Sequence, residues 1–359
     1  MISERLLAYP DLPTPAVREG EFPFAAVGLS HSHIYGMCEG LLSAGASLSW
    51  VYEEDEALLS AFLKRYPHVR AARCLDEILE DKTVKMVASA AIPSHRCPIG
   101  LRVMASGKDF FADKAPFVTM DALEAARQAV KETGRKYAVF FSERCANESA
   151  VYAGYLIERG AIGRVLNVIG IGPHKLNNGE RRGEWFYKRE TAGGILIDIG
   201  SHQIEQFLYY TGNESAEISH ARIANYAHAE YPEFDDFGDC AVTGKNGASG
   251  YFRVDWFAPE AFPAFGDGRT VIVGTEGTIE LRKYHDPSTG LSDLVVLSNK
   301  DGCESRSVKG KVGLPFFGQL IRDCIDRTER AMTAEHAFTA AALCIRAQEA
   351  ALDLTPREL

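Results

Sequence analysis

Residues 22–33 have the sequence FPFAAVGLSHSH, in which a short apolar run ends at Gly28 and a helical pattern extends from His33 to about Ala44. An apolar run, a glycine and a helical pattern in this order predict a strand, a tight turn and a helix. The exposed N–H groups and the positive dipole end at such a turn favour an anion. The stretch therefore predicts the pyrophosphate site of a dinucleotide at the head of an α/β domain.

The turn keeps only part of the G-x-G-x-x-G fingerprint, because Gly28 is followed by Ser30 and His33 where the second and third glycines stand. Ser30 is small, and its hydroxyl could donate to a phosphate. Glu53 ends the next predicted strand, where a carboxylate accepts from the adenosine ribose hydroxyls. A carboxylate there would repel a 2′-phosphate, so we expect NAD rather than NADP. The alternative is a tight turn of some other α/β protein, with Glu53 simply solvated.

Two histidines flank Ser32 in this turn, and imidazole is a common metal ligand. A pair of histidines without further ligands in the pattern is a weak indication of metal. We therefore expect no metal, and we place His31 and His33 among the residues next to the cofactor.

The N-terminal part of the chain alternates between strand and helix patterns. Strands that alternate with helices of about ten to fifteen residues imply a parallel sheet with right-handed crossovers. This predicts a doubly wound Rossmann domain over residues 22–147, after an extended lead-in at 1–21. The expected strands after the first are Leu48–Tyr52, Lys85–Ala90, Asp109–Ala112 and Lys136–Phe141, and the expected helices are Glu56–Tyr66, Leu75–Glu80, His95–Ser106 and Thr119–Thr133.

The pattern changes near Asn147, where one helix leads into segments that alternate apolar and polar residues between turn signals. This predicts an α+β domain over residues 148–359 with an open, largely antiparallel sheet for substrate binding and oligomerisation. The fold class is therefore α/β with two domains. The expected helices are Ala150–Arg159, Phe316–Arg327 and Ala334–Ala351, and the expected strands are Val165–Ile171, Ser219–Tyr226, Cys240–Thr243, Gly250–Trp256, Arg269–Gly274 and Gly277–Tyr284.

Composition narrows the partners and the compartment. The 359 residues carry a net charge of −10 without a Lys/Arg cluster, so we expect a small-molecule ligand and no nucleic acid. No apolar run approaches the roughly 20 residues that span a bilayer, so we expect no membrane segment. The eight cysteines form no C-x-x-C pair, which favours reduced thiols in the cytoplasm.

Three further stretches carry a family resemblance: AIPSH at 91–95, GKDFFADKAP at 107–116 and GGILIDIGSH at 193–202. In this order and spacing the chain resembles the Gfo/Idh/MocA family, named for glucose-fructose oxidoreductase and inositol dehydrogenase. The resemblance extends from Phe22 to the last helix. It implies a Rossmann domain, an open-sheet domain and a cleft for a sugar or polyol. The Glu-Lys-Pro motif of the family corresponds to residues 113–116, with an aspartate in place of the glutamate and Ala115 inserted.

The resemblance implies catalytic roles for Lys114, Asp198 and His202. Oxidation of a secondary alcohol needs a base near the hydroxyl, and imidazole has a suitable ordinary pKa near 6.5. His202 is then the base and Asp198 its partner, while Lys114, desolvated beside a nicotinamide, would stabilise the developing alkoxide. The alternative is structural: Asp198 as a helix-start residue and His202 as a buried histidine.

Further residues complete the expected site. Pro93 and His95 follow the expected strand Lys85–Ala90 and are assigned to the cofactor. Polar and aromatic side chains expected to line the substrate site, with a packing role as the alternative for each, are Arg144, Asn147, His174, Lys175 and Trp185.

The sequence thus predicts an NAD(P)-dependent dehydrogenase acting on a CH–OH group of a sugar, glycoside or cyclitol. A second hypothesis is a glycoside-processing enzyme that oxidises transiently and recycles its NAD. A third is a non-catalytic relative that senses a sugar or nucleotide. Alternating apolar residues at 251–256 predict a homo-oligomer, either a dimer or a tetramer.

Overall fold

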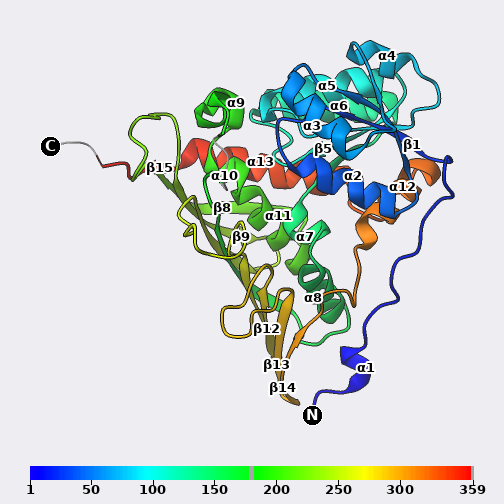
Figure 1. Cartoon of the computed structure of the whole chain (residues 1–359). Helices are drawn as coiled ribbons and strands as arrows, with labels where there is room; N and C mark the ends of the chain where they lie inside the picture. The colour runs from blue at the N-terminus through cyan, green and yellow to red at the C-terminus, as the bar shows by residue number, and fades with distance from the viewer. Residues whose placement is uncertain (178–181, 357–359) are drawn as a thin grey trace. The chain divides into compact units, whose positions relative to one another are not determined.

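The computed structural model describes residues 1–177 and 182–356, and the chain divides into two compact units (Figure 1). The parallel-sheet unit contains residues 13–140 and 315–338. The mixed-sheet unit contains residues 1–12, 141–314 and 339–359. These ranges differ from the expected domains at both ends of the chain, because the segment 315–338 folds with the N-terminal sheet and the first twelve residues fold with the other unit.

The parallel-sheet unit has the doubly wound architecture that the sequence predicts. Its six strands are all parallel in the order β3-β2-β1-β4-β5-β6. In Figure 1, α5 and α6 lie on one side of this sheet and α2 and α12 on the other. The elements are β1 (Pro23–Val27), α2 (His33–Ser43), β2 (Ser47–Tyr52), α3 (Glu56–Arg65), β3 (Arg70–Ala71), α4 (Leu75–Glu80), β4 (Met86–Ser89), α5 (Pro93–Ala105), β5 (Asp109–Asp113), α6 (Met120–Thr133), β6 (Tyr137–Phe140) and α12 (Pro315–Asp326).

Helix α12 belongs to this unit because its aromatic side chains fill the core beside α2. A Cβ atom at Gly40 of α2 would lie 2.2 Å from the Phe317 ring, so only glycine leaves room for that ring. The Phe317 ring also meets Phe140 at a centroid distance of 5.7 Å. This contact explains why residues 315–338 depart from the expected domain range.

The mixed-sheet unit has nine strands in the order β14-β13-β12-β11-β7-β10-β9-β8-β15. Only the pairs β7/β10 and β8/β15 are parallel, which confirms the open, largely antiparallel sheet. The sequence patterns did not indicate β13, β14 or β15. The strands are β7 (Val165–Pro173), β8 (Ala216–Ala224), β9 (Phe237–Gly244), β10 (Ser249–Asp255), β11 (Arg269–Gly274), β12 (Gly277–Arg282), β13 (Leu294–Asn299), β14 (Gly302–Ser307) and β15 (Leu352–Asp353).

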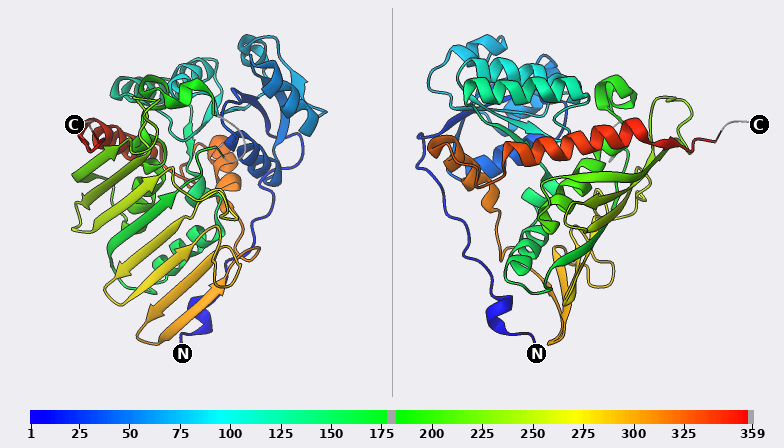
Figure 2. Two further views of the ribbon diagram at one scale, coloured as in Figure 1. Left: turned by 60° about the vertical axis from the view of Figure 1, so that its left-hand side comes forward. Right: turned by 180° about the vertical axis from the view of Figure 1, so that it is seen from behind.

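Helices cover one face of this sheet, and Figure 2 shows no helix of the described residues across the other. Glycines in the strands allow the helices to pack closely on the sheet. A Cβ atom at Gly250 of β10, for example, would lie 2.7 Å from the ring of Phe207 on the helix above it. On the opposite face Ile169 and Tyr251 are exposed. The remaining helices are α7 (Ser142–Cys145), α8 (Glu148–Glu158), the 3₁₀ helix η1 (Glu184–Tyr187), α9 (Arg189–Ala192), α10 (Ile195–Asp198), α11 (Gly200–Thr211) and α13 (Ala334–Ala350).

The expected extended lead-in contains one short helix, α1 (Glu4–Leu7). The Leu7 carbonyl accepts from the Tyr152 hydroxyl at 2.7 Å, which ties the first residues to α8. None of the helices in the described ranges is long and apolar enough to cross a membrane. All eight cysteines have free thiols.

Candidate active site

The turn after β1 brings two strand ends into close contact. Gly28 has φ +68°, and a Cβ atom there would lie 2.5 Å from the Ala91 Cβ, so both the backbone conformation and the space require glycine. The His31 N–H donates to the Ala90 carbonyl at 3.0 Å. Gly28 and Ala91 follow β1 and β4, the neighbouring strands where the strand order reverses. This switch point is where doubly wound sheets bind dinucleotides, so the residues present fit that group.

Glu53 lies at the end of β2, as expected, and its carboxylate also shapes the turn. Its Oε2 accepts from the Leu29 N–H at 2.5 Å, and its Oε1 accepts from the N–H groups of Glu54 and Asp55 at 2.9 and 3.0 Å. The carboxylate is therefore oriented by three backbone donors beside the turn. The position was predictable from the sequence, whereas the bond to Leu29 was not.

Both turn histidines face Asp113, the last residue of β5. The His33 Nδ1 lies 2.8 Å from one carboxylate oxygen, and the His31 Nδ1 lies 3.4 Å from the other. Asp113 is fully buried, while both histidines are partly exposed. Burial acts to raise the pKa of Asp113, but the charges of His33 and Arg96 outweigh it and lower that pKa.

These three residues also place one possible metal-ligand atom each within 4.8 Å of one another. Two imidazoles and a carboxylate are a donor set for a divalent transition metal. Two of the three ligand atoms already have partners: the His31 Nδ1 accepts from the His33 N–H at 3.2 Å, and the Arg96 Nη2 lies 3.2 Å from the Asp113 Oδ2. Since a buried guanidinium beside the carboxylate opposes a cation, the geometry favours a hydrogen-bonded cluster, and the absence of metal stays a prediction.

Arg96 was not identified from the sequence, yet it anchors the expected catalytic lysine. This fully buried side chain donates to the carbonyls of Ala91 at 2.7 Å and Ala115 at 2.9 Å. It also donates to the Asp113 carbonyl at 3.2 Å. The backbone on both sides of Lys114 is therefore fixed, and the Lys114 side chain is itself buried.

The two remaining expected cofactor residues begin α5. Pro93 is buried at the first position of the helix, where its missing N–H costs nothing. His95 is exposed in the first turn. Both therefore lie at the helix end nearest the switch point, as the strand-turn-helix pattern predicts.

Asp198 and His202 lie one helical turn apart in the mixed-sheet unit. Asp198 ends α10, and Ile199 keeps helical angles (φ −78°, ψ −36°) into α11. Gly194 precedes α10 with φ +99°, and a Cβ atom there would lie 2.5 Å from the Gln348 side chain. His202 is buried, whereas Asp198 is half-buried. The expected spacing of the two side chains is therefore present in the structure.

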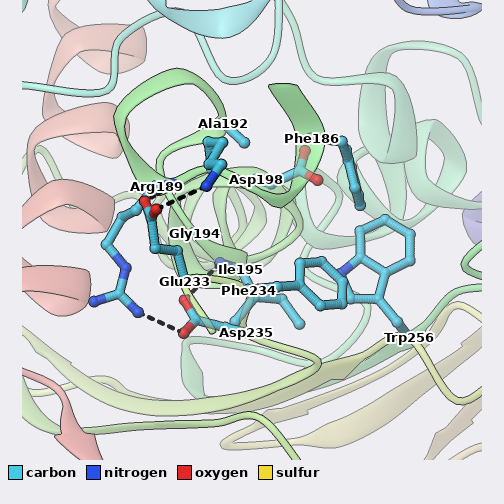
Figure 3. Close-up of a pocket in the computed structure, with 11 residues that line it drawn as sticks. Phe186, Arg189, Ala192, Gly194, Ile195, Asp198, Glu233, Phe234, Asp235 and Trp256 are labelled. Carbon is cyan, nitrogen blue, oxygen red and sulfur yellow. Dashed lines mark hydrogen bonds and ion pairs between the residues drawn. The ribbon is translucent and has the colours of Figure 1, made fainter. Parts of the chain in front are cut away.

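A small pocket lies beside Asp198 (Figure 3). The rings of Phe186, Phe234 and Trp256 form one side of it, with Phe186 and Trp256 at a centroid distance of 5.2 Å. Trp185, the expected aromatic residue, is half-buried against Phe186 and does not line the pocket. An aromatic wall beside a carboxylate is present, but Trp256 provides it rather than Trp185.

Beside α11 lies a second group of buried charges that the sequence analysis did not identify. The fully buried Glu143 of α7 accepts through its Oε2 from Lys283 Nζ at 2.7 Å, Gln203 Nε2 at 3.1 Å and Gln206 Nε2 at 3.3 Å. The His174 Nε2 lies 4.0 Å from its Oε1. Burial acts to raise the pKa of Glu143, but the charge of Lys283 and then those of the histidines hold it well below its ordinary value.

The other expected substrate residues have structural partners. The Arg144 guanidinium pairs with Glu205 at 2.6 Å and stacks over Tyr209. Asn147 caps α8, and Lys175 donates to the Glu260 carbonyl at 2.8 Å. These contacts fit the packing alternatives, and the substrate roles of the three residues stay predictions. His174 is the exception, since it lies beside Glu143.

The chain combines a Rossmann-type unit with an open mixed sheet, and it has Lys114 after β5 and an Asp/His pair at a helix start. A sequence model described as the GFO/IDH/MocA C-terminal domain matches residues 151–280. A crystal structure of a candidate oxidoreductase from Erwinia carotovora atroseptica SCRI1043 is 46% identical, with a TM-score of 0.90 over 93% of this chain and 99% of that chain. The chain belongs to the Gfo/Idh/MocA family.

Two curated relatives have named activities. The scyllo-inositol 2-dehydrogenase (NAD(+)) of Bacillus subtilis (strain 168) is 28% identical over 218 residues, which are 58% of this chain and 59% of that protein. The D-xylose dehydrogenase of Paenarthrobacter nicotinovorans is 26% identical over 153 residues, 41% of this chain and 39% of that protein. The matched regions therefore span less than two thirds of either relative.

Proposed function

We propose that the protein is an oxidoreductase that moves a hydride between a secondary hydroxyl of a sugar, glycoside or cyclitol and NAD. The observation that carries the proposal is the combination of a glycine-dependent switch point at Gly28 with a buried His202 one turn after Asp198. The activities named for the inositol and xylose dehydrogenases support the substrate class.

The proposal gives each of these residues a role that follows from its own surroundings. A bound nicotinamide supplies the hydride acceptor. His202 takes the proton of the substrate hydroxyl, since imidazole ordinarily titrates near pH 6.5, and Asp198 orients it. Lys114, whose flanking carbonyls Arg96 holds, stabilises the oxygen as negative charge develops on it.

The cofactor preference follows from Glu53. Its carboxylate lies at the end of β2, where it would accept from a ribose 2′-hydroxyl and repel a 2′-phosphate. NAD should therefore bind at least about tenfold more tightly than NADP, because removing a charged hydrogen bond and adding repulsion costs more than about 1.4 kcal/mol. Titration of both cofactors into the protein and into Glu53→Gln measures this preference, and the variant should lose most of it.

The decisive experiment has two parts, because some enzymes retain and recycle their cofactor. Denatured protein is analysed by mass spectrometry for released nucleotide, and the nucleotide-free protein is titrated with NAD. NADH formation is then followed with a panel of sugars, glycosides and inositols. If no nucleotide is released and none binds, the proposal fails at its first step.

A second candidate function is transient oxidation, in which the keto intermediate acidifies a neighbouring C–H bond before NAD is restored. The same residues would serve it. Solvent deuterium that appears in the product without net NADH would favour this chemistry over simple dehydrogenation.

A third candidate is a non-catalytic sensor, which the altered turn at Ser30 and His33 and the altered motif at 113–116 favour. Ligand binding without turnover in any assay, and unchanged by Lys114→Ala, would support it.

We further propose a homo-oligomer, a dimer or a tetramer, assembled in the cytoplasm. The exposed Ile169 and Tyr251 on the uncovered face of the mixed sheet support the first part, and the eight free thiols support the second. Sedimentation of a stable monomer at micromolar concentration would contradict the oligomer.

A further inference from the structure

The pair of Glu143 and Lys283 is a costly feature for a protein core. The Lys283 side chain is 0% exposed and the Glu143 side chain 1%. Taking two charges out of water costs several kcal/mol for each ion, and well-packed apolar residues are often as stable as a buried ion pair. Glu143 also lies on a helix of only four residues, where the sequence offers no packing periodicity. The pair therefore calls for an explanation other than stability.

The two oxygens of Glu143 have different environments. Oε2 holds Lys283, Gln203 and Gln206 within hydrogen-bond distance, whereas Oε1 accepts no hydrogen bond among the described residues. The His174 Nδ1 lies 3.0 Å from the Gly172 carbonyl, which only accepts, so Nδ1 carries a proton. The other nitrogen, Nε2, lies 4.0 Å from Oε1, and it carries a lone pair when the ring is neutral and an N–H when the ring is charged.

The same carboxylate is connected to His202. The Gln206 amide donates both to Glu143 Oε2 and, at 2.8 Å, to the His202 carbonyl. The charges of Glu143 and His202 also act on each other. The carboxylate therefore both fixes the first turn of α11 and lies within electrostatic reach of the imidazole that the proposed reaction uses as its base.

Two other acids on α10 and α11 interact with cations among the described residues. Glu205 on α11 pairs with Arg144 of α7, and Asp198 of α10 interacts with the charge of Arg182. Burial and then the charge of Glu143 raise the pKa of Tyr284, so that phenol stays neutral. Glu143 and Lys283 carry opposite charges. Removal of one should therefore change the electrostatic potential at His202 and His174 in the opposite direction to removal of the other.

We infer that Glu143 is a positioning residue for the proposed reaction: its buried carboxylate, balanced by Lys283, sets the protonation of His202 and His174 and holds the turn that carries His202. The inference rests on the proposed function, because it concerns the base of that reaction. Loss of Glu143 removes a negative charge and disfavours imidazolium. Loss of Lys283 removes a positive charge and favours it.

The test compares Glu143→Gln with Lys283→Gln in the full-length protein. Histidine titrations are followed by NMR, with His202→Gln and His174→Gln spectra to assign the signals. We expect the His202 midpoint to move down by about one pH unit in Glu143→Gln and up in Lys283→Gln, the usual effect of one nearby charge. The acid limb of kcat/KM for oxidation should move in the same two directions.

Glu205→Gln is the matched control, since it removes a buried carboxylate from another ion pair on α11. It should lower the melting temperature and move the His202 midpoint less than Glu143→Gln does. Shifts in one direction for both test variants, or no shift in either, would overturn the inference. If Glu143→Gln does not fold, the sign of the Lys283→Gln shift decides. The NMR measurement needs no substrate, so opposite shifts without turnover would count against the proposed function and leave the electrostatic assignment standing.

Discussion

Each unit contains a buried carboxylate accompanied by one cation and two histidines, and the two groups are organised differently. In the parallel-sheet unit, Asp113 has both oxygens near imidazole nitrogens, at 2.8 and 3.4 Å. In the mixed-sheet unit, Glu143 is held by an ammonium and two amides, and the His174 Nε2 lies 4.0 Å from its Oε1. The first arrangement fixes the histidines at a turn. In the second, the inferred role of Glu143 is to set the protonation of the two histidines.

The largest expected effect separates the chemistry of the two groups. His202→Gln should lower kcat by about 10²- to 10⁴-fold, the usual contribution of general base catalysis, while leaving the dissociation constant for NAD unchanged. Steady-state kinetics and nucleotide titration on the same preparation measure both. A decrease in kcat of less than about tenfold would mean that His202 has a structural role. The histidines around Glu143 would then not differ in function from those around Asp113.

The next effect tests the anchoring role of Asp113. Asp113→Asn leaves the buried Arg96 without its carboxylate, which should cost about 3–5 kcal/mol of unfolding free energy. NAD binding should weaken by about tenfold because the turn histidines lose their anchor. Urea unfolding and NAD titration measure the two effects. Asp109→Asn at the other end of β5 is the control, since its partner Arg327 is partly exposed, and it should leave NAD binding unchanged.

A smaller effect appears in acid. The pKa of Glu143 is lowered on folding from an ordinary value of 4.5, so the group stabilises the folded state above that pH and loses this contribution as the pH falls. At pH 3.5, one unit below the unfolded value, about 1.4 kcal/mol should be lost. Urea unfolding at pH 6 and pH 3.5 should therefore show a smaller difference for Glu143→Gln than for the native chain. Equal differences would mean that Glu143 is not held ionised.

The smallest effect concerns Asn147, which was expected to touch substrate. Its Oδ1 accepts from the Ala150 N–H at 3.2 Å as the cap of α8. Asn147→Ala should cost about 1 kcal/mol of stability, the usual value of such a cap, with kcat and KM unchanged. An increase in KM for the sugar substrate without loss of stability would restore the substrate role.

The sequence predicted most of the fold because its signals are local. The apolar runs and helical patterns before Phe140 place each strand of the parallel sheet except the two-residue β3. The sequence patterns fail where contacts between distant residues determine the structure. The segments of β13 and β14 lack a clear apolar–polar alternation. Helix α12 packs with the parallel-sheet unit because Phe317 lies over Gly40.

The site divides in the same way. Lys114, Asp198 and His202 were predicted from motifs, which record spacing along the chain, and their roles stay predictions. Arg96 and Glu143 were missed because their importance depends on tertiary neighbours: an arginine on α5 and a glutamate on a four-residue helix have nothing unusual in sequence. The ion pair of Arg144 was not predictable for the same reason, since its partner Glu205 is 61 positions away.

Residues 315–338 pack with the parallel-sheet unit rather than with the expected C-terminal domain, and this matters for the design of truncated fragments. The chain passes between the units after Leu12, Phe140, Leu314 and Phe338, so neither unit is one continuous segment. A fragment ending near Asn147 would lack Phe317. It would therefore expose the apolar surface beside Gly40 that this ring covers, and we expect it to aggregate. The same fragment joined through a short linker to residues 315–338 recovers that ring, and should be the smallest piece of this protein in which nucleotide binding can be studied alone.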